Sequence, residues 1–95
     1  MRVTREQLGF IKSSIITIRP NAHVYLFGSR VYDDKKGGDI DILILSNINL
    51  SVKEKGQIRR NFYSEFGEQK LDLISFTFEE KSSFKDLILL DAIEI

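Results

Sequence analysis

The feature that most constrains the fold is an alternation of helix-start signals with short apolar segments. Three capping boxes of the form Ser/Thr-x-x-Glu/Gln are present, at Thr4–Gln7, Ser51–Glu54 and Thr77–Glu80. In such a box the first and fourth side chains bond the free amide hydrogens of a helix start. Three apolar, strand-type segments lie between the boxes, at 22–27, 40–45 and 71–76. This order predicts helices that alternate with strands, which is typical of an α/β domain.

The predicted helices each have an apolar face. After the first box, the residues Leu8, Ile11, Ile15 and Ile18 recur at helical spacing. Pro20 ends this helix, because proline disfavours helical geometry in the residue before it. The second helix should bury Ile58, Phe62 and Phe66, and the third, opening at Thr77, should bury Phe84, Leu87 and Ile88. We also expect a short helical turn after Ser29 and a short final strand at 92–95.

Length and composition bound the fold further. A chain of 95 residues allows one core, so we expect a single domain over residues 1–95. The expected fold class is α/β, with a mixed β-sheet of three or four strands packed against about four helices. The absence of cysteine excludes a disulfide scaffold and a thiolate metal site, and the single histidine excludes a multi-histidine site in one chain.

Partners and location are bounded by charge and hydropathy. No apolar run exceeds four residues and no signal peptide is apparent, so we expect no membrane contact and a cytoplasmic protein. The net charge of zero argues against stable nucleic-acid binding by phosphate neutralisation. Residues 1–19 and 53–60 each carry +3, and residues 65–94 carry −5. These runs indicate either solvated helix faces or a basic side that faces a partner.

Gly28 and Ser29 directly follow a buried strand. Glycine lets the backbone turn sharply close to a ligand, and serine adds a hydroxyl donor beside the amide hydrogens of a helical turn. That combination suits phosphate oxygens, although a plain turn has the same local pattern. Arg30 either contacts a phosphate or braces the following loop through an acidic side chain.

Two aspartates two positions apart open the second strand. Side chains at i and i+2 of a strand share a face, so Asp39 and Asp41 project together and can converge on one hard cation. A strand with one solvated face would explain an isolated Asp-x-Asp equally well. That alternative predicts further polar residues on the same face, yet Leu43 and Leu45 follow there. The acids therefore stand at the beginning of an otherwise apolar strand.

Asp72 is a lone acid in the third apolar segment. It is either a charge on an edge strand that faces water or the third member of an acidic cluster. If the segments 40–45 and 71–76 are neighbouring strands, Asp72 lies beside Asp39 and Asp41. Three carboxylates together with substrate phosphates suit Mg²⁺, which prefers oxygen ligands.

Gly28-Ser29, the spaced pair Asp39 and Asp41, and a later acid in a strand resemble the minimal nucleotidyltransferases (MNT) of the DNA polymerase β-like superfamily. The resemblance covers nearly the whole chain and implies the small nucleotidyltransferase fold. It implies that Asp39, Asp41 and Asp72 are catalytic and bind two Mg²⁺ ions. Gly28, Ser29 and Arg30 would bind the nucleotide. Residues 30–38 form a linker of nine residues, one fewer than the commonest family spacing.

The resemblance implies transfer of a nucleoside monophosphate from ATP or another nucleoside triphosphate to a hydroxyl. Bare domains of this kind are often antitoxins paired with a helical HEPN-type toxin. The first hypothesis is therefore an antitoxin that transfers AMP to its partner protein. The second is a non-catalytic antitoxin that acts by occlusion, and the third is a transferase acting on RNA or a small molecule.

Overall fold

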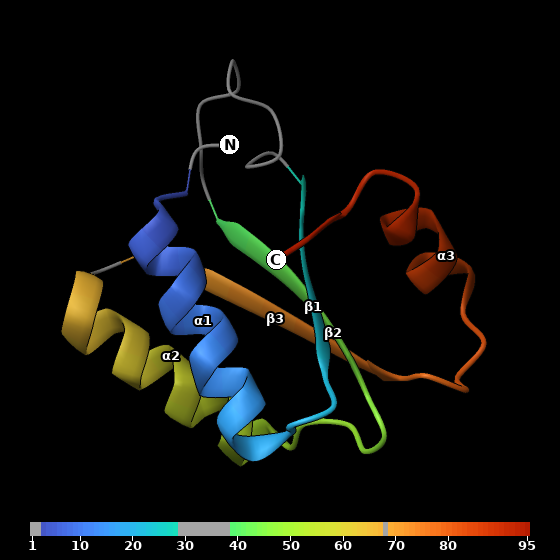
Figure 1. Cartoon of the computed structure of the whole chain (residues 1–95), viewed down its shortest axis with the longest axis horizontal. Coiled ribbons are helices and arrows are strands. Elements are labelled where there is room, and N and C mark those ends of the chain that lie inside the picture. The colour runs from blue at the N-terminus through green and yellow to red at the C-terminus, as the bar shows by residue number, and fades with distance from the viewer. Residues whose placement is uncertain (1–2, 29–38, 68) are drawn as a thin grey trace.

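The computed structural model describes residues 3–28, 39–67 and 69–95. Figure 1 shows the arrangement of the elements. In chain order they are α1 (Arg5–Ile18), β1 (His23–Phe27), β2 (Ile40–Ser46), α2 (Val52–Phe66), β3 (Leu71–Thr77), α3 (Ser83–Leu89) and β4 (Ile93–Glu94). The described residues thus form three helices and four strands, slightly fewer helices than the sequence suggests. The short turn expected after Ser29 lies outside the described residues.

The first two capping boxes start helices as predicted. Thr4 Oγ1 accepts from the Gln7 amide at 3.1 Å, and Gln7 Oε1 accepts from the Thr4 amide at 3.0 Å. Ser51 and Glu54 make the same reciprocal pair at 3.0 and 2.9 Å at the start of α2. Each pair satisfies two amide hydrogens that the helix cannot, which fixes where α1 and α2 begin.

The third capping box forms its hydrogen bonds but starts no helix. The Thr77 amide donates to Glu80 Oε1 at 3.2 Å, and the Glu80 amide donates to Thr77 Oγ1 at 3.1 Å. α3 begins only at Ser83, and its cap is Ser82, whose Oγ accepts from the Lys85 amide at 3.2 Å. The prediction of a helix opening at Thr77 is therefore wrong. The same local bonds stabilise a turn at the end of β3, because such side chains serve turns as well as helix starts.

The inward face of α3 also differs from the prediction. Ile88 is buried as expected, but Phe84 and Leu87 are 51% and 64% exposed. Lys85 packs inward instead, and its ammonium donates to three backbone carbonyls of the preceding segment. A helix of seven residues buries one narrow face, and here that face satisfies the polar backbone as well as the core.

The sheet is mixed, with the strand order β3-β2-β1-β4. β1 pairs antiparallel with both β2 and β4, whereas β2 and β3 are parallel. The parallel connection is made by α2, which crosses one face of the sheet beside α1 (Figure 1). β2 is therefore a central strand with partners on both sides.

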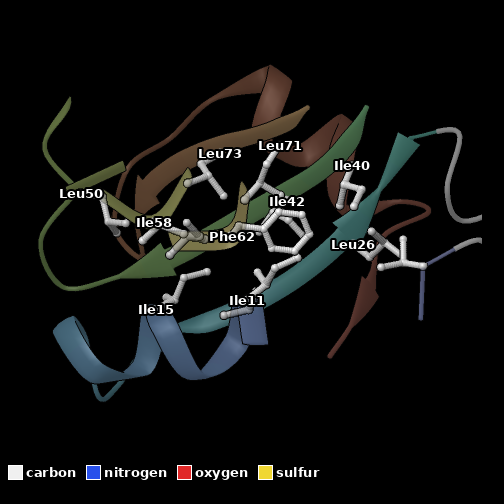
Figure 2. Close-up of a cluster of buried hydrophobic side chains, with 13 residues drawn as sticks. Ile11, Ile15, Leu26, Ile40, Ile42, Leu50, Ile58, Phe62, Leu71 and Leu73 are labelled. Atoms are coloured by element: carbon white, nitrogen blue, oxygen red, sulfur yellow. The ribbon is translucent and has the colours of Figure 1, made fainter. Parts of the chain in front are cut away.

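The main core lies between the sheet and the pair α1 and α2 (Figure 2). Phe62 is its largest fully buried side chain, and burying such a side chain contributes about 2–3 kcal/mol. Its ring makes edge and tilted contacts with those of Phe10 and Phe66 at centroid distances of 6.1 and 4.9 Å. The buried residues of this core are Val3, Ile11, Ile15, Val24, Leu26, Ile40, Ile42, Ile44, Leu50, Ile58, Phe62, Leu71 and Leu73.

The opposite face of the sheet is covered more thinly. Its buried core consists of Leu43, Leu45 and Ile88, with partly buried side chains around them. α3 is the helix on this side, apart from α1 and α2 (Figure 1). The two faces are thus unequal: one is sealed by two long helices, and the other leaves room for a site.

Candidate functional site

The three aspartates singled out by the sequence lie on the thinly covered face. Along β2, Ile40, Ile42 and Ile44 point into the core beneath α1 and α2. Side chains alternate across a strand, so Asp41 points to the other face, together with Leu43 and Leu45. The same alternation in β3 places Asp72 opposite to Leu71 and Leu73.

Strand pairing brings the carboxylates together. β2 and β3 are neighbours, and the parallel register sets Asp41 directly beside Asp72. Asp39 precedes β2 by one residue. Carboxylate oxygens of Asp39, Asp41 and Asp72 all lie within 4.8 Å of one another, and all three residues are partly buried. The condition on which the sequence prediction of a triad depended, adjacent strands, is met.

In the acidic cluster (Asp39, Asp41 and Asp72), burial and the neighbouring carboxyls make ionisation of Asp41 unfavourable. The pKa of Asp41 rises from 3.8 to about 6. The first cause is desolvation by burial, followed by the charge and hydrogen bond of Asp72 and then by the charge of Asp39. Both effects disfavour the ionised carboxylate. The cluster thus favours taking up positive charge, as a proton on Asp41 or as a cation.

Lys70 supplies one such charge, and the sequence reasoning missed it. Its Nζ lies 3.4 Å from Asp39 Oδ2, and the side chain is 67% exposed. The hydrogen bond and charge of Asp39, with the charge of Asp72, raise the pKa of Lys70. The signal was present in the sequence, because Lys70 stands two positions before Asp72 and such residues share a face in an extended chain.

Gly28 forms the wall of the acidic cluster. It follows β1, has φ of 79°, and lies so close to Asp41 that an added β-carbon would collide with Asp41 Oδ2. The preceding residue, Phe27, pairs with Asp41 across the two strands. Glycine is therefore needed here both for its backbone angle and for its missing side chain. Ser29 and Arg30, also predicted to bind nucleotide, lie outside the described residues.

The donor set fits a hard divalent cation. It consists of carboxylate oxygens from the beginnings of two adjacent strands, with no nitrogen or sulfur ligand among the three residues. Mg²⁺ takes oxygen ligands and commonly uses one or two carboxylates together with substrate phosphates.

Among the helices of residues 3–28, 39–67 and 69–95, none has the length and hydropathy of a membrane-spanning segment.

Comparisons with solved structures find the same fold. A chain of the MntA–HepT toxin–antitoxin complex aligns with a TM-score of 0.67 and 18% identity, over 95% of this chain and 68% of that chain. A chain of the Shewanella oneidensis complex of an MNT antitoxin with a tri-AMPylated HEPN toxin gives 0.58 and 20%, over 93% and 70%. A Sulfolobus solfataricus protein described as a candidate nucleotidyltransferase gives 0.60 and 25%, over 94% and 76%.

Sequence comparison assigns the family. No curated protein sequence matches this chain. The family model for the nucleotidyltransferase domain matches residues 8–95, which include Gly28 and all three aspartates. The matched segment spans all four strands of the sheet and the acidic cluster. This chain belongs to the nucleotidyltransferase domain family.

Proposed function

We propose that this chain transfers AMP from ATP to a hydroxyl of a partner protein, and that the partner is a HEPN-type toxin for which it is the antitoxin. The observation that carries the proposal is the convergence of Asp39, Asp41 and Asp72 beside Gly28 on the open face of the sheet. The likeness to chains from MNT–HEPN complexes, one of them with a tri-AMPylated toxin, supports the choice of acceptor.

In this proposal the aspartates would hold two Mg²⁺ ions, with Asp39 and Asp41 contributing to both and Asp72 to one. When bound, the ions neutralise the triphosphate and stabilise the attacking and leaving oxygens. The acceptor oxygen forms a bond to the α-phosphorus, the bond from that phosphorus to the bridging oxygen breaks, pyrophosphate leaves, and the hydroxyl proton passes to water.

The chain's own contribution is position and charge. The pairing of β2 with β3 sets Asp41 beside Asp72, and Asp39 directly precedes β2, which keeps the three carboxylates close without a cation. Gly28 leaves the approach to Asp41 open, and the proposed role of Ser29 and Arg30 is to hold triphosphate oxygens. Lys70 is placed to exchange its contact with Asp39 for one with a phosphate once a cation is bound.

The test is incubation of the chain with ATP, Mg²⁺ and the HEPN-type protein proposed as its partner, followed by intact-mass spectrometry. The partner should gain the mass of AMP with the wild-type chain and none with Asp39→Asn. If the complex forms without any mass gain, and Asp39→Asn still silences the toxin, the chain acts by occlusion. Labelling of free tRNA without the partner would contradict the choice of a protein acceptor.

A further inference from the structure

α3 carries an apolar ridge on its solvent side. Phe84, Leu87 and Leu90 follow one another at intervals of three and are 51%, 64% and 77% exposed. At 100° per residue Phe84 and Leu87 are 60° apart on the exposed part of α3, and Leu90, the C-cap residue directly after the helix, continues this exposed surface. Three large apolar side chains side by side on a surface indicate a binding surface, since scattered exposure is the ordinary case.

A pocket of about 230 Å³ lies at the foot of this ridge. It is lined by Phe27, Gly28, Phe84, Leu87, Ile88 and Asp91. Gly28 is thus shared between the pocket and the acidic cluster, where it lies against Asp41. A side chain bound in the pocket would therefore contact Gly28, which itself lies against Asp41, one of the carboxylates that the proposed reaction requires.

The ridge is flanked by acidic side chains. Asp86 in α3 and Asp91 in the turn after it are both exposed, each is next in sequence to a residue of the ridge, and Asp91 also lines the pocket. Residues 77–95 carry five acids against Lys81 and Lys85. Lys85 does not offset them at the surface, because its ammonium is buried against three backbone carbonyls.

We propose that this ridge (Phe84, Leu87 and Leu90) and its pocket are the docking surface for the protein acceptor, which contributes an apolar side chain flanked by lysine or arginine. This inference rests on the proposed function. Its basis is charge complementarity: a negative rim attracts a basic protein surface and repels nucleic acid. Docking there would bring the partner's hydroxyl to the cluster from the α3 side, so that positioning supplies part of the catalysis.

The experiment compares Leu90→Lys with the matched control Val52→Lys, at a residue 86% exposed at the start of α2. Leu90 is outside the pocket lining, and lysine is tolerated at a helix C-terminus. The probe is the HEPN-type protein proposed as the partner, carrying an inactivated nuclease site. Leu90→Lys should weaken its binding about tenfold or more, as for a central interface residue, and Val52→Lys less than about twofold. Binding of Mg²⁺–ATP to the free chain should be unchanged in both.

A second pair of variants separates apolar contact from charge. Leu90→Ser should weaken partner binding without adding charge. Asp86→Asn combined with Asp91→Asn should weaken it and make it less sensitive to salt, since exposed charges are screened. Equal partner affinity for wild type and Leu90→Lys would overturn the docking surface, as would an equal loss for Val52→Lys. Self-association of the wild-type chain that Leu90→Lys abolishes would assign the ridge to a second copy and also overturn it.

The outcomes distinguish the two proposals. If wild type labels the partner and Leu90→Lys labels it as efficiently, the docking surface is wrong and the transferase function stands. If wild type binds the partner without transferring AMP, and Leu90→Lys abolishes that binding, the docking surface stands and the transferase function is wrong.

Discussion

Gly28 lies so close to the Asp41 carboxylate that no side chain larger than a hydrogen atom fits between them. Gly28 directly follows β1 and has φ of 79°, and a β-carbon there would overlap Asp41 Oδ2. The antiparallel pairing of Phe27 with Asp41 fixes this approach of the two backbones, so a side chain at Gly28 would have to displace the Asp41 carboxylate. The conformation of the backbone at Gly28 and the position of the Asp41 carboxylate therefore depend on each other.

The first prediction is that Gly28→Ala weakens Mg²⁺–ATP binding beyond what its loss of folding stability explains. The positive φ costs alanine about 1–2 kcal/mol, and the new methyl group also displaces the Asp41 carboxylate. Calorimetry should show a loss of Mg²⁺–ATP binding of at least about tenfold. Gly67→Ala is the control, since Gly67 also has a positive φ, 84°, but an added β-carbon there meets nothing. It should destabilise the chain and leave Mg²⁺–ATP binding unchanged; equal binding losses in both variants would contradict a role for the contact.

The second prediction concerns pH. In the folded chain the pKa of Asp41 is about 6, against 3.8 when unfolded. Between these values the unfolded chain has lost a proton that the folded chain retains, so the free energy of unfolding falls as pH rises through this window. Without metal, Asp41→Asn should be more stable than wild type at pH 8 by about 1 kcal/mol, allowing for solvent screening of a partly exposed group.

The same comparison near pH 3.5 should show only a small difference, because wild-type Asp41 is protonated in the folded chain and mostly protonated in the unfolded chain. Urea denaturation at the two pH values measures this, with Glu65→Gln, an exposed carboxyl on α2, as the control. With saturating Mg²⁺ the order at pH 8 should reverse, because a bound cation stabilises only the chain that retains its carboxylates. An Asp41→Asn effect independent of pH would refute the electrostatic account.

The third prediction is that Lys70 competes with metal. Its Nζ lies 3.4 Å from Asp39 Oδ2, so it neutralises part of the charge that a cation would use. Lys70→Met should bind Mg²⁺ alone a few-fold more tightly, because a repelling positive charge is gone. Titration calorimetry without nucleotide is the measurement, and Lys53→Met, an exposed lysine of α2, is the control. Weaker Mg²⁺ binding by Lys70→Met would show that Lys70 instead organises the carboxylates.

The fourth prediction is that Lys85 is structural. Its buried ammonium donates to the carbonyl oxygens of Thr77, Phe78 and Glu80 at 3.3, 3.1 and 2.9 Å. Lys85→Met keeps the apolar stem but leaves these acceptors without the ammonium, which should cost about 2–3 kcal/mol of stability. The exposed Lys81→Met should change it by less than about 0.5 kcal/mol. Chemical denaturation measures both, and similar losses in the two variants would remove the structural role.

Local sequence alone determined where most elements begin and how their faces divide. The boxes at Thr4 and Ser51 were predicted because capping is a contact between residues three apart. Two-residue alternation also predicted that Asp41 in β2 and Asp39 directly before it project together, and helical periodicity identified Ile58 and Phe62 as core. Such patterns need no knowledge of what packs against the segment.

The tertiary structure decided what depends on distant parts of the chain. It paired β2 with β3 in the register that sets Asp72 beside Asp41, and it pressed Gly28 against that carboxylate. The bonds of Thr77 and Glu80 fit a turn as well as a helix start, and only the folded chain decided that they close a turn and that α3 begins at Ser83. Packing in the folded chain also turned Lys85 inward. The sequence encodes these contacts only through pairing and burial, whose free energies depend on partners many residues away.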